Sequence, residues 1–507
     1  MKTLLLEIGT EEIPAGYIAP ALAALESMLA QKLADARLAH GRIQTFGTPR
    51  RLAVTVAELA ARQKRLTSEV LGPPRKVGYD SDGRPTTAAV KFAEKVGLPV
   101  NRLGVASTPK GEYLSATVTD PGLATTALLK TLLPDIILAI PFPKRMRWAD
   151  LTISFARPIH SLLALYGGSR IGFTLGGIRS GRTTFGHRFM HPRPIKVAEP
   201  AAYVEALRSG FVIVDPAERR RLIAEGAAQA AASVGGSVLP DEELLGTVSQ
   251  LVEYPAIAVG RFADAFLELP AEVLITAMRE HQKYFAVVDT GGRLLPHFIA
   301  VNNTPVQDMA VVVRGHQRVL RARLEDAKFF FKSDRETSLD SMVEKLKSVL
   351  FQAQLGSIYD KVRRVRGLSR FVADQLGGDP ELGGQAERAA WLCKADLVSQ
   401  MVGEFPKLQG IMGGSMPRPR GNPRRWRAPS KSTTGRPIPA GRCRRPRPGR
   451  WSPSPTRWTP SAAASGPGWP PRVRPTPMPS AARASVSSRS CAAAGWHSPS
   501  QLWYRKA

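Results

Sequence analysis

The hydrophobic pattern is most regular in the stretch Leu267–Phe285, which reads LELPAEVLITAMREHQKYF. Pro270 suits the first turn of a helix, because that position needs no backbone N–H donor. The apolar residues that follow fall on one helix face: Val273, Leu274, Ala277 and Met278. Two short apolar runs, 284–288 and 294–301, then flank a turn that contains two glycines. The pattern predicts a helix followed by a β-hairpin.

The first 330 residues mix short strands with helices. The expected strands are Leu4–Ile8, Ala53–Val56 and Gly111–Val118. The expected helices are Tyr17–Leu38, Thr87–Val96, Thr125–Leu133, Pro200–Arg208 and Ala217–Val234. Strands and helices do not alternate regularly, so the pattern favours an α+β multidomain protein over a doubly wound parallel sheet.

From Leu339 onward the pattern predicts helices throughout, up to the glycines near Gly414. One expected helix face holds Met342, Leu346, Val349 and Leu350, and a further helix is expected over Gln385–Val402. We therefore expect three parts: a mixed body over residues 1–335, a helical domain over 336–414, and a tail over 415–507.

The tail differs sharply in composition from the rest. It holds 18 of the 42 prolines, 6 of the 8 tryptophans and none of the 42 acidic residues. It also holds 19 of the 71 Lys and Arg residues, which leaves a net charge of +10 for the first 414 residues. Without patterned apolar surface the tail is expected to be disordered and to adhere to RNA, membranes and chaperones. A natural basic tail is one explanation, although such tails rarely hold this many tryptophans.

Composition narrows the class of protein only moderately. The three cysteines, Cys393, Cys443 and Cys491, match neither a zinc knuckle nor an even disulfide set, which favours a reducing, cytoplasmic location. No secretory signal peptide opens the chain, and no run of 18 apolar residues would cross a membrane. A moderately basic body suits a polyanion such as RNA, and equally an ordinary basic enzyme.

No catalytic or metal-binding motif has the required spacing. Glu280-His281 lacks the second histidine of a zinc-binding helix, and there is no Walker phosphate loop. No histidine occurs between His316 and His497, so the helical region lacks the ligands of a metal-dependent phosphohydrolase. We interpret Asp396 as structural, as a cap or ion-pair partner.

Three groups of cations are the candidates for RNA contact, because phosphates are bound by exposed Lys and Arg and unpaired bases by aromatic faces. The candidates are Lys144, Arg145, Arg147 and Trp148; then Arg179, Arg182, His187 and Arg188; then Arg318, Arg321 and Arg323. The Arg50-Arg51 turn and the polar helix end at 280–283 are weaker candidates. The alternative for each group is a solvated or ion-paired surface.

Several long blocks of sequence carry a family resemblance. They are LLLEIGTEEIPA (4–15), TPRRLAV (48–54), FPKRMRW (142–148), GHRFM (186–190), LVEYP (251–255), FLELPAEVLITAMREHQKYF (266–285), RVLRARLEDAKFF (318–330) and KADLVSQMVGEFPKLQGIMG (394–413). In this order they resemble the beta subunit of the bacterial heterotetrameric glycyl-tRNA synthetase. One block departs: the family usually reads Gly-Asn-Glu-Arg where this chain has Gly315-His316-Gln317-Arg318, so an acid is lost.

The resemblance implies a role in protein synthesis. In that family the alpha subunit activates glycine with ATP and Mg²⁺, and the beta subunit binds tRNA(Gly) and completes an α2β2 assembly. We therefore expect no cofactor and no catalytic residue in this chain, and neither DNA nor a membrane as a partner. The helical domain resembles a degenerate phosphohydrolase of the His-Asp type. A metal-dependent phosphohydrolase and a stand-alone basic RNA-binding protein remain the alternatives.

A shifted reading frame is the other explanation of the tail. Joining the last base of each codon to the first two of the next lets Trp451–Pro460 spell Val-Ser-Leu-Ala-Asp-Lys-Val-Asp-Thr. The same regrouping lets Pro475–Ala482 spell Asp-Pro-Tyr-Ala-Leu-Arg-Arg. The resembled family has Ala-Asp-Lys-x-Asp-Thr and then Asp-Pro-Tyr-Ala-Leu-Arg-Arg in this order. We expect a frameshift after Gly414 that replaces the family's C-terminal, anticodon-binding part.

Overall fold

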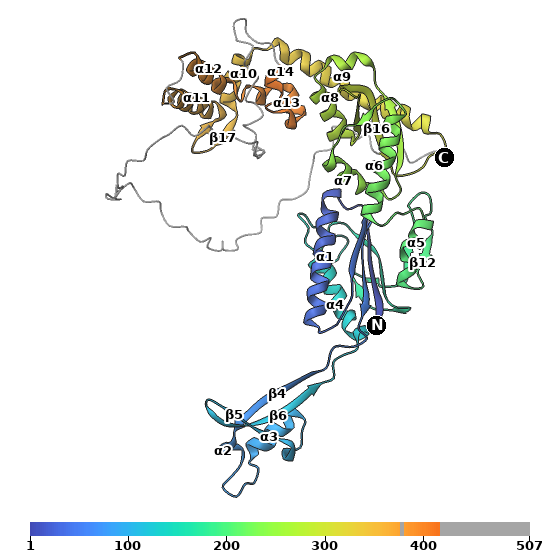
Figure 1. Ribbon diagram of the computed structural model, residues 1–507, viewed down its shortest axis with the longest axis vertical. Helices are drawn as coiled ribbons and strands as arrows, with labels where there is room; N and C mark the ends of the chain where they lie inside the picture. Colours follow the sequence, from blue (N-terminus) through green and yellow to red (C-terminus); the bar gives the residue numbers. More distant parts are fainter. Residues whose placement is uncertain (376–379, 416–507) are drawn as a thin grey trace, which may run out of the picture. The chain divides into compact units, whose positions relative to one another are not determined.

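The computed structural model of the chain describes residues 1–375 and 380–415 (Figure 1). The predictions of disorder and of a shifted frame in the tail lie outside these residues. Within them the fold is α+β, with several separate antiparallel sheets and many helices, as the irregular order of sequence patterns predicts.

The N-terminal sheet has five antiparallel strands in the order β2-β3-β1-β7-β8. These strands are β1 (Lys2–Thr10), β2 (Ile43–Thr48), β3 (Arg51–Leu59), β7 (Ile159–Tyr166) and β8 (Ser169–Arg170). Helices α1 (Ala15–Asp35) and α4 (Thr125–Ala139) lie on one face of this sheet. Helix α4 continues beyond the predicted end at Leu133, past Pro134, because Ile136 and Ile137 are buried in the same core.

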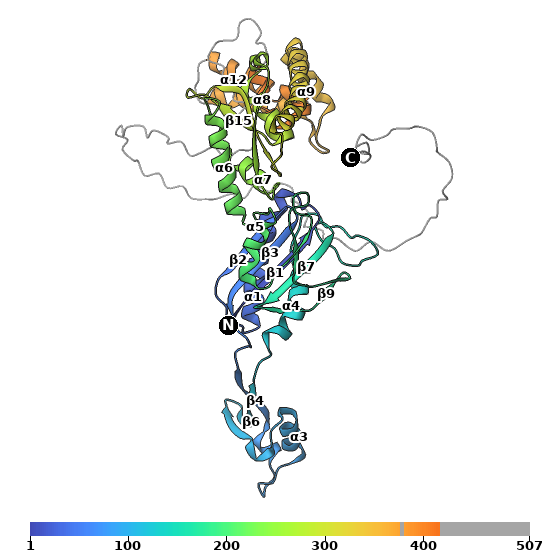
Figure 2. The same cartoon turned by 90° about the vertical axis from the view of Figure 1, so that its right-hand side faces the viewer.

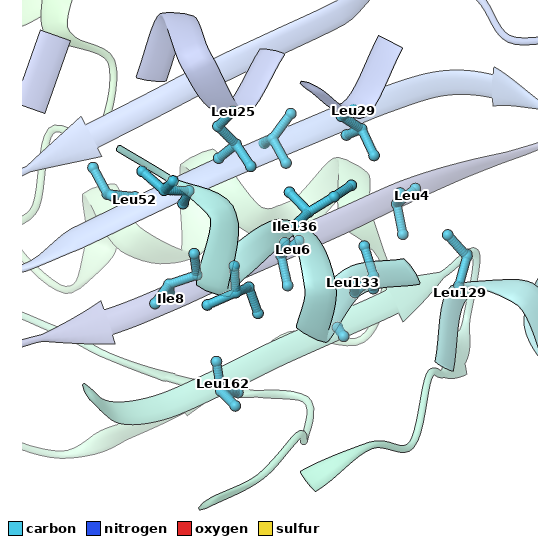
Figure 3. Packing of buried hydrophobic residues seen from close by; sticks show 14 of the residues in the cluster. Leu4, Leu6, Ile8, Leu25, Leu29, Leu52, Leu129, Leu133, Ile136 and Leu162 are labelled. Carbon is cyan, nitrogen blue, oxygen red and sulfur yellow. The ribbon is translucent and has the colours of Figure 1, made fainter. Parts of the chain in front are cut away.

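Strand β1 shows why the sheet has two buried faces. Leu4, Leu6 and Ile8 point toward α1 and α4, where they pack against side chains of both helices (Figure 3). Leu5 lies on the opposite face with α5 (Tyr203–Ser209). Since side chains alternate along a strand, a strand buried on both faces reads as a nearly continuous apolar run, here LLLEI with Glu7 as its single charged residue. Four short strands follow β8: β9 (Thr174–Leu175), β10 (Ile178–Arg179), β11 (Thr183–Phe185) and β12 (Pro194–Lys196).

A small sheet in the order β4-β6-β5 is inserted between β3 and α4. Its elements are β4 (Leu66–Pro74), α2 (Arg75–Gly78), α3 (Thr87–Val96), β5 (Gly104–Thr108) and β6 (Gly111–Asp120). Helix α3 has the predicted bounds and ends at Gly97, whose φ of 66° few other residues adopt.

A second large sheet, which contains the strand β15 labelled in Figure 2, has the antiparallel order β13-β15-β16-β14. Its strands are β13 (Ser237–Val238), β14 (Ala256–Arg261), β15 (Phe285–Val288) and β16 (Leu294–Asn302). One face is covered by α6 (Pro216–Ala232) and α7 (Glu242–Ser249), and the other by α8 (Ala271–Ala277) and α9 (Met309–Glu336). The predicted helix and hairpin of 267–301 are therefore confirmed, with a π-helical turn at Met278–Gln282 between them.

The region after α9 is helical with one interruption. It contains α10 (Leu339–Lys345), a hairpin of β17 (Leu350–Gln352) and β18 (Gly356–Ser357), then α11 (Ile358–Gln375) and α12 (Pro380–Leu392). The prediction of uninterrupted helix is wrong at the hairpin, which turns at Gly356 with a φ of 81°. Leu350, predicted to share one helix face with Met342 and Leu346, lies in this hairpin instead and is 70% exposed.

The single helix predicted over Gln385–Val402 is also wrong. Helix α12 ends at Leu392, and a 3₁₀ turn (Ala395–Val398), α13 (Gln400–Glu404) and α14 (Met412–Ser415) follow. Ser399 breaks the pattern because its hydroxyl accepts the N–H of Val402 and starts α13. Asp396 is buried and accepts the backbone N–H groups of Gly410 (2.6 Å) and Gly413 (3.2 Å), which confirms its interpretation as structural.

One buried cluster joins the second sheet to the helical region. It contains Leu320 and Leu324 of α9 together with Met401, Leu408 and Met412. The core is therefore continuous across residue 335. None of the described helices is both long enough and apolar enough to cross a membrane.

Candidate nucleic-acid interface

The first predicted cation group lies in the loop after α4. Arg145 donates to the carbonyl oxygens of Leu138 (2.6 Å) and Ser154 (3.0 Å), so its guanidinium holds the loop against the end of α4. Trp148 is half-buried against the core of the first sheet. Lys144 and Arg147 are exposed and form no ion pair among the described residues, so they remain free for phosphate contact.

The four residues of the second predicted group lie in different environments, three of them exposed or partly exposed and one fully buried. Arg179 is exposed on β10, Arg182 donates to the carbonyl of Gly168 (3.1 Å), and Arg188 pairs with Glu11 (3.6 Å). His187 is fully buried, which removes it from any RNA-facing surface. Its Nδ1 accepts the N–H groups of the two residues Phe189 and Met190, and burial lowers the pKa of the ring, so it is neutral near pH 7.

The third group lies on α9, where the helix borders a groove of about 760 Å³. Arg318 and Arg321 line this groove, whereas Arg323 points elsewhere and pairs with Glu404 (3.4 Å). Arg318 is exposed and has no ion pair in the part of the chain that the structure describes. The structure therefore brings together two of the three predicted arginines.

Sequence reasoning missed further cations of the same groove. Arg261 and Lys328 also line it, over a floor that includes Phe262 and Phe266. Lys328 lies seven residues after Arg321, so a count at helical spacing along α9 would have found it. Arg261 ends β14 and is far away in sequence, so only the fold brings it near α9.

Carboxylates neutralise part of this groove. Glu325 pairs with Arg321 (2.8 Å), Asp264 with Arg261 (2.6 Å), and Glu268 with Lys328 at the longer distance of 3.9 Å. These pairs are exposed, so phosphates can compete for the same cations at little energetic cost. The groove can therefore bind a phosphodiester backbone, with Arg318 as its unpaired cation.

The block that departs from the resembled family lies at this groove. His316 is directed away from it: its Nδ1 lies 2.8 Å from the Tyr284 hydroxyl and its Nε2 lies 2.8 Å from the Asn302 side-chain oxygen. Burial raises the pKa of Tyr284 to about 12 and lowers that of His316, so both groups are neutral near pH 7. Gln317 lines the groove, and its amide stands where the resembled family has an acid, which removes a negative charge from the phosphate-binding surface.

The Arg50-Arg51 turn, a weaker candidate for phosphate contact, has another role at its second residue. Arg51 is 3% exposed and bonds Glu253 through Nε and Nη2 (3.3 and 3.2 Å), while its Nη1 lies 3.6 Å from Glu7. Burial alone would lower the pKa of Arg51, but Glu253 and Glu7 together raise it, so the guanidinium stays charged. We call Glu7, Arg51 and Glu253 the buried triad.

The buried triad ties separate segments together. Glu7 accepts the hydroxyls of Thr184 and Tyr203 (2.7 and 2.6 Å), and Glu253 accepts that of Thr48 (2.7 Å). Segments 4–15, 48–54 and 251–255 therefore meet in one polar cluster. A charge inside an apolar strand, such as Glu7 in LLLEI, is the sequence signal that could have indicated it.

Residues 1–375 and 380–415 contain no candidate metal-binding site. No group of three or more His, Cys, Asp or Glu side chains is placed to hold a metal ion there. Exposed cations along a groove, with Arg318 unpaired among the described residues, are typical of the broad class of polyanion-binding proteins.

Comparison with known proteins makes the assignment specific. A sequence model of the glycyl-tRNA synthetase beta subunit family matches residues 4–425. The chain is 51% identical over 415 residues to a glycine–tRNA ligase beta subunit of Desulfatibacillum aliphaticivorans, covering 82% of this chain and 60% of the relative. Similar relatives occur in Syntrophus aciditrophicus (51%, covering 81% and 59%) and Myxococcus xanthus (49%, covering 83% and 60%). The chain belongs to the glycyl-tRNA synthetase beta subunit family, and it spans about 60% of the length of these curated relatives.

Proposed function

We propose that the chain acts as the beta subunit of a glycine–tRNA ligase, binding tRNA(Gly) and assembling with an alpha subunit for ATP-dependent formation of glycyl-tRNA. The observation that carries this proposal is identity of about 50% to curated beta subunits over more than 400 residues. ATP and Mg²⁺ would be used by the alpha subunit, in an α2β2 complex located in the cytoplasm. Neither alternative function gains support from these relatives.

The RNA contacts would come mainly from the α9 groove. Arg318 and Arg321 supply phosphate-binding groups there, and Gln317 leaves the surface without an additional carboxylate. Lys144 and Arg147 of the loop after α4, and Arg179 of β10, would form secondary contacts, since they are exposed and without ion pairs within the described ranges.

Residues 336–414 would be a degenerate, incomplete domain of the His-Asp type that serves assembly rather than hydrolysis. The Oδ2 atom of Asp396 is used by two backbone N–H groups, and burial raises the pKa of its carboxyl group, both of which suit a structural role. Residues after Gly414 would be read in a shifted frame. In support, the family match ends at residue 425, close to the change in composition.

A reconstitution experiment tests the proposed function. The chain and a version with the frame restored after Gly414 are each mixed with the cognate alpha subunit and a tRNA(Gly) transcript. We expect both to form a complex with alpha, seen by light scattering, and to bind tRNA(Gly). Charging with labelled glycine should be strong only for the restored version, because two contact regions on one tRNA raise the effective concentration of its acceptor end. Failure of both versions to bind alpha and tRNA(Gly) would contradict the proposal.

A further inference from the structure

One face of α11 exposes three large apolar side chains in adjacent turns. Leu368, Phe371 and Val372 are 63%, 60% and 51% exposed. Their spacing of three and four residues places them side by side on the helix. We call them the α11 stripe.

The opposite face of α11 already has its partners. Val362 and Ala373 are buried, and Arg366 bonds Glu387 of α12 (2.7 Å) and lies over the Trp391 ring. The α11 stripe is therefore not the core-facing side of a shifted helix. It is a second apolar face that no described residue covers.

The neighbouring hairpin adds to this exposed apolar surface. Leu350, Phe351 and Leu355 are 70%, 40% and 48% exposed. Together with the α11 stripe they make up six of the 22 exposed large apolar residues of the described chain, all within residues 350–372. Such concentration marks an interaction surface, because isolated exposed apolar residues are normal and clustered ones are not.

The last described element of the chain lies inside this helical region. Met412 is fully buried, and α14, which begins with it, is the last described element. The last described element therefore packs in the same core as α10, α11 and α13. The matched part covers about 60% of the curated relatives' length, so about 40% of each relative has no counterpart in the match.

We propose that the α11 stripe is the docking face for the polypeptide that follows α14 in the full-length relatives, which the restored frame of this gene would encode. Charge supports this occupant over the sequence as written. Arg363 and Arg364 flank the stripe, are exposed and have no ion pair among the described side chains. The written segment has 19 cations and no acid, whereas the two regrouped stretches, codons 451–460 and 475–482, together spell three aspartates, one lysine and two arginines, which is a balanced charge. The proposal rests on family membership and the frame hypothesis, and not on the RNA-binding role.

Hydrogen exchange on two full-length proteins, the chain as written and the frame-restored chain, tests the proposal. We expect the amides of residues 364–375 to exchange at least about tenfold more slowly in the restored chain, because burial of the stripe raises the cost of local opening. The triple variant Leu368→Lys, Phe371→Lys, Val372→Lys is then made in both proteins. It should lower the Tm of the restored chain by about 4 °C or more and should not lower the Tm of the chain as written.

A matched control uses equally exposed apolar residues elsewhere. Leu66→Lys, Val77→Lys and Leu123→Lys together change three side chains that are 49%, 54% and 58% exposed. Their effect on Tm should be the same in both proteins. The proposal is overturned if residues 364–375 exchange equally in both, if the restored chain gains no folded structure, or if the written chain is a dimer that the stripe variant converts to monomer. The last result would assign the stripe to a second copy.

Discussion

The α9 groove and the buried triad use the same residue type in opposite environments. Both arise from arginine-containing blocks that the sequence presents as candidates for RNA contact. Arg321 of the groove has a side chain 74% exposed and one partner four residues away on its own helix. Arg51 of the triad is 3% exposed and lies between two carboxylates from distant parts of the chain.

The difference shows that burial, more than charge, separates a structural arginine from a binding one. A buried guanidinium requires partners for its charge and donors, and once these are in place it has no capacity left for a ligand. An exposed arginine with one weak pair exchanges that pair for a phosphate at little cost. The five predictions below are in order of decreasing effect, and all but the one at His187 test this contrast.

The largest effect is expected at Arg51. Arg51→Met should lower the free energy of unfolding by about 3–5 kcal/mol, because Glu7 and Glu253 would remain buried without their counter-charge. Urea unfolding followed by circular dichroism measures this. The same substitution at Arg321 is the control and should change stability by less than about 1 kcal/mol. Equal effects at both sites would remove the distinction between the two regions.

The second effect concerns tRNA binding. Changing Arg318 and Arg321 together to Glu should weaken binding of a tRNA(Gly) transcript by about tenfold or more, and should reduce the slope of log K against log salt by roughly 1.5–2. Fluorescence anisotropy at several salt concentrations gives both quantities. Arg84→Glu with Arg293→Glu is the control, since it changes the charge equally at two exposed arginines with nearby acids. A slope that is unchanged relative to the wild type would show that the α9 arginines are only solvated.

The third effect is the pH dependence of stability. Burial opposes ionisation of Glu253, but Arg51 and the Thr48 hydroxyl outweigh it, so its folded pKa lies below the ordinary value. The stability that this carboxylate contributes is present above its unfolded pKa of about 4.3 and is lost as pH falls through the lower folded value. Glu253→Gln should therefore flatten the decline of unfolding free energy below about pH 4.3. A decline identical to that of the wild type would contradict the assignment.

His187 should make the free energy of unfolding depend on pH in a second, higher pH range. Burial lowers its folded pKa below the unfolded value of about 6.5, so stability falls as pH drops through about 6.5 and the unfolded ring takes up a proton. His187→Gln should flatten the fall in stability that begins as pH drops through about 6.5, and should leave the effect of Glu253 below about pH 4.3 unchanged.

The smallest effect is expected at Gln317. Gln317→Glu returns a carboxylate to the groove and should weaken tRNA binding by a few-fold, corresponding to less than about 1 kcal/mol. Gln229→Glu, at an exposed position of α6, is the matched control and should leave affinity unchanged. Equal affinities for the two variants would mean that residue 317 does not face the bound RNA.

The sequence predicted most of the elements that depend on local periodicity. Helix α3 and the hairpin of β15 and β16 were found because their patterns are regular and their turns contain glycine. The breaks at Gly356 and Ser399 were missed because one depends on a left-handed backbone and the other on a capping hydroxyl within an apolar pattern. The site was only partly predictable. Arg318 and Arg321 are close in sequence, but Arg261 reaches the groove through tertiary structure, and His187 carries no sequence signal of its burial.

The continuous core around α9 has a consequence for the synthesis of the protein. Leu320 and Met412 belong to the same buried cluster, so the ribosome must add about 90 residues after one before the other appears. At roughly 5–20 residues per second this interval lasts roughly 5–20 s. During it the apolar side of α9 has emerged while α13 and α14 do not yet exist. The order of translation, and not the stability of the finished fold, sets the period in which this surface depends on chaperones.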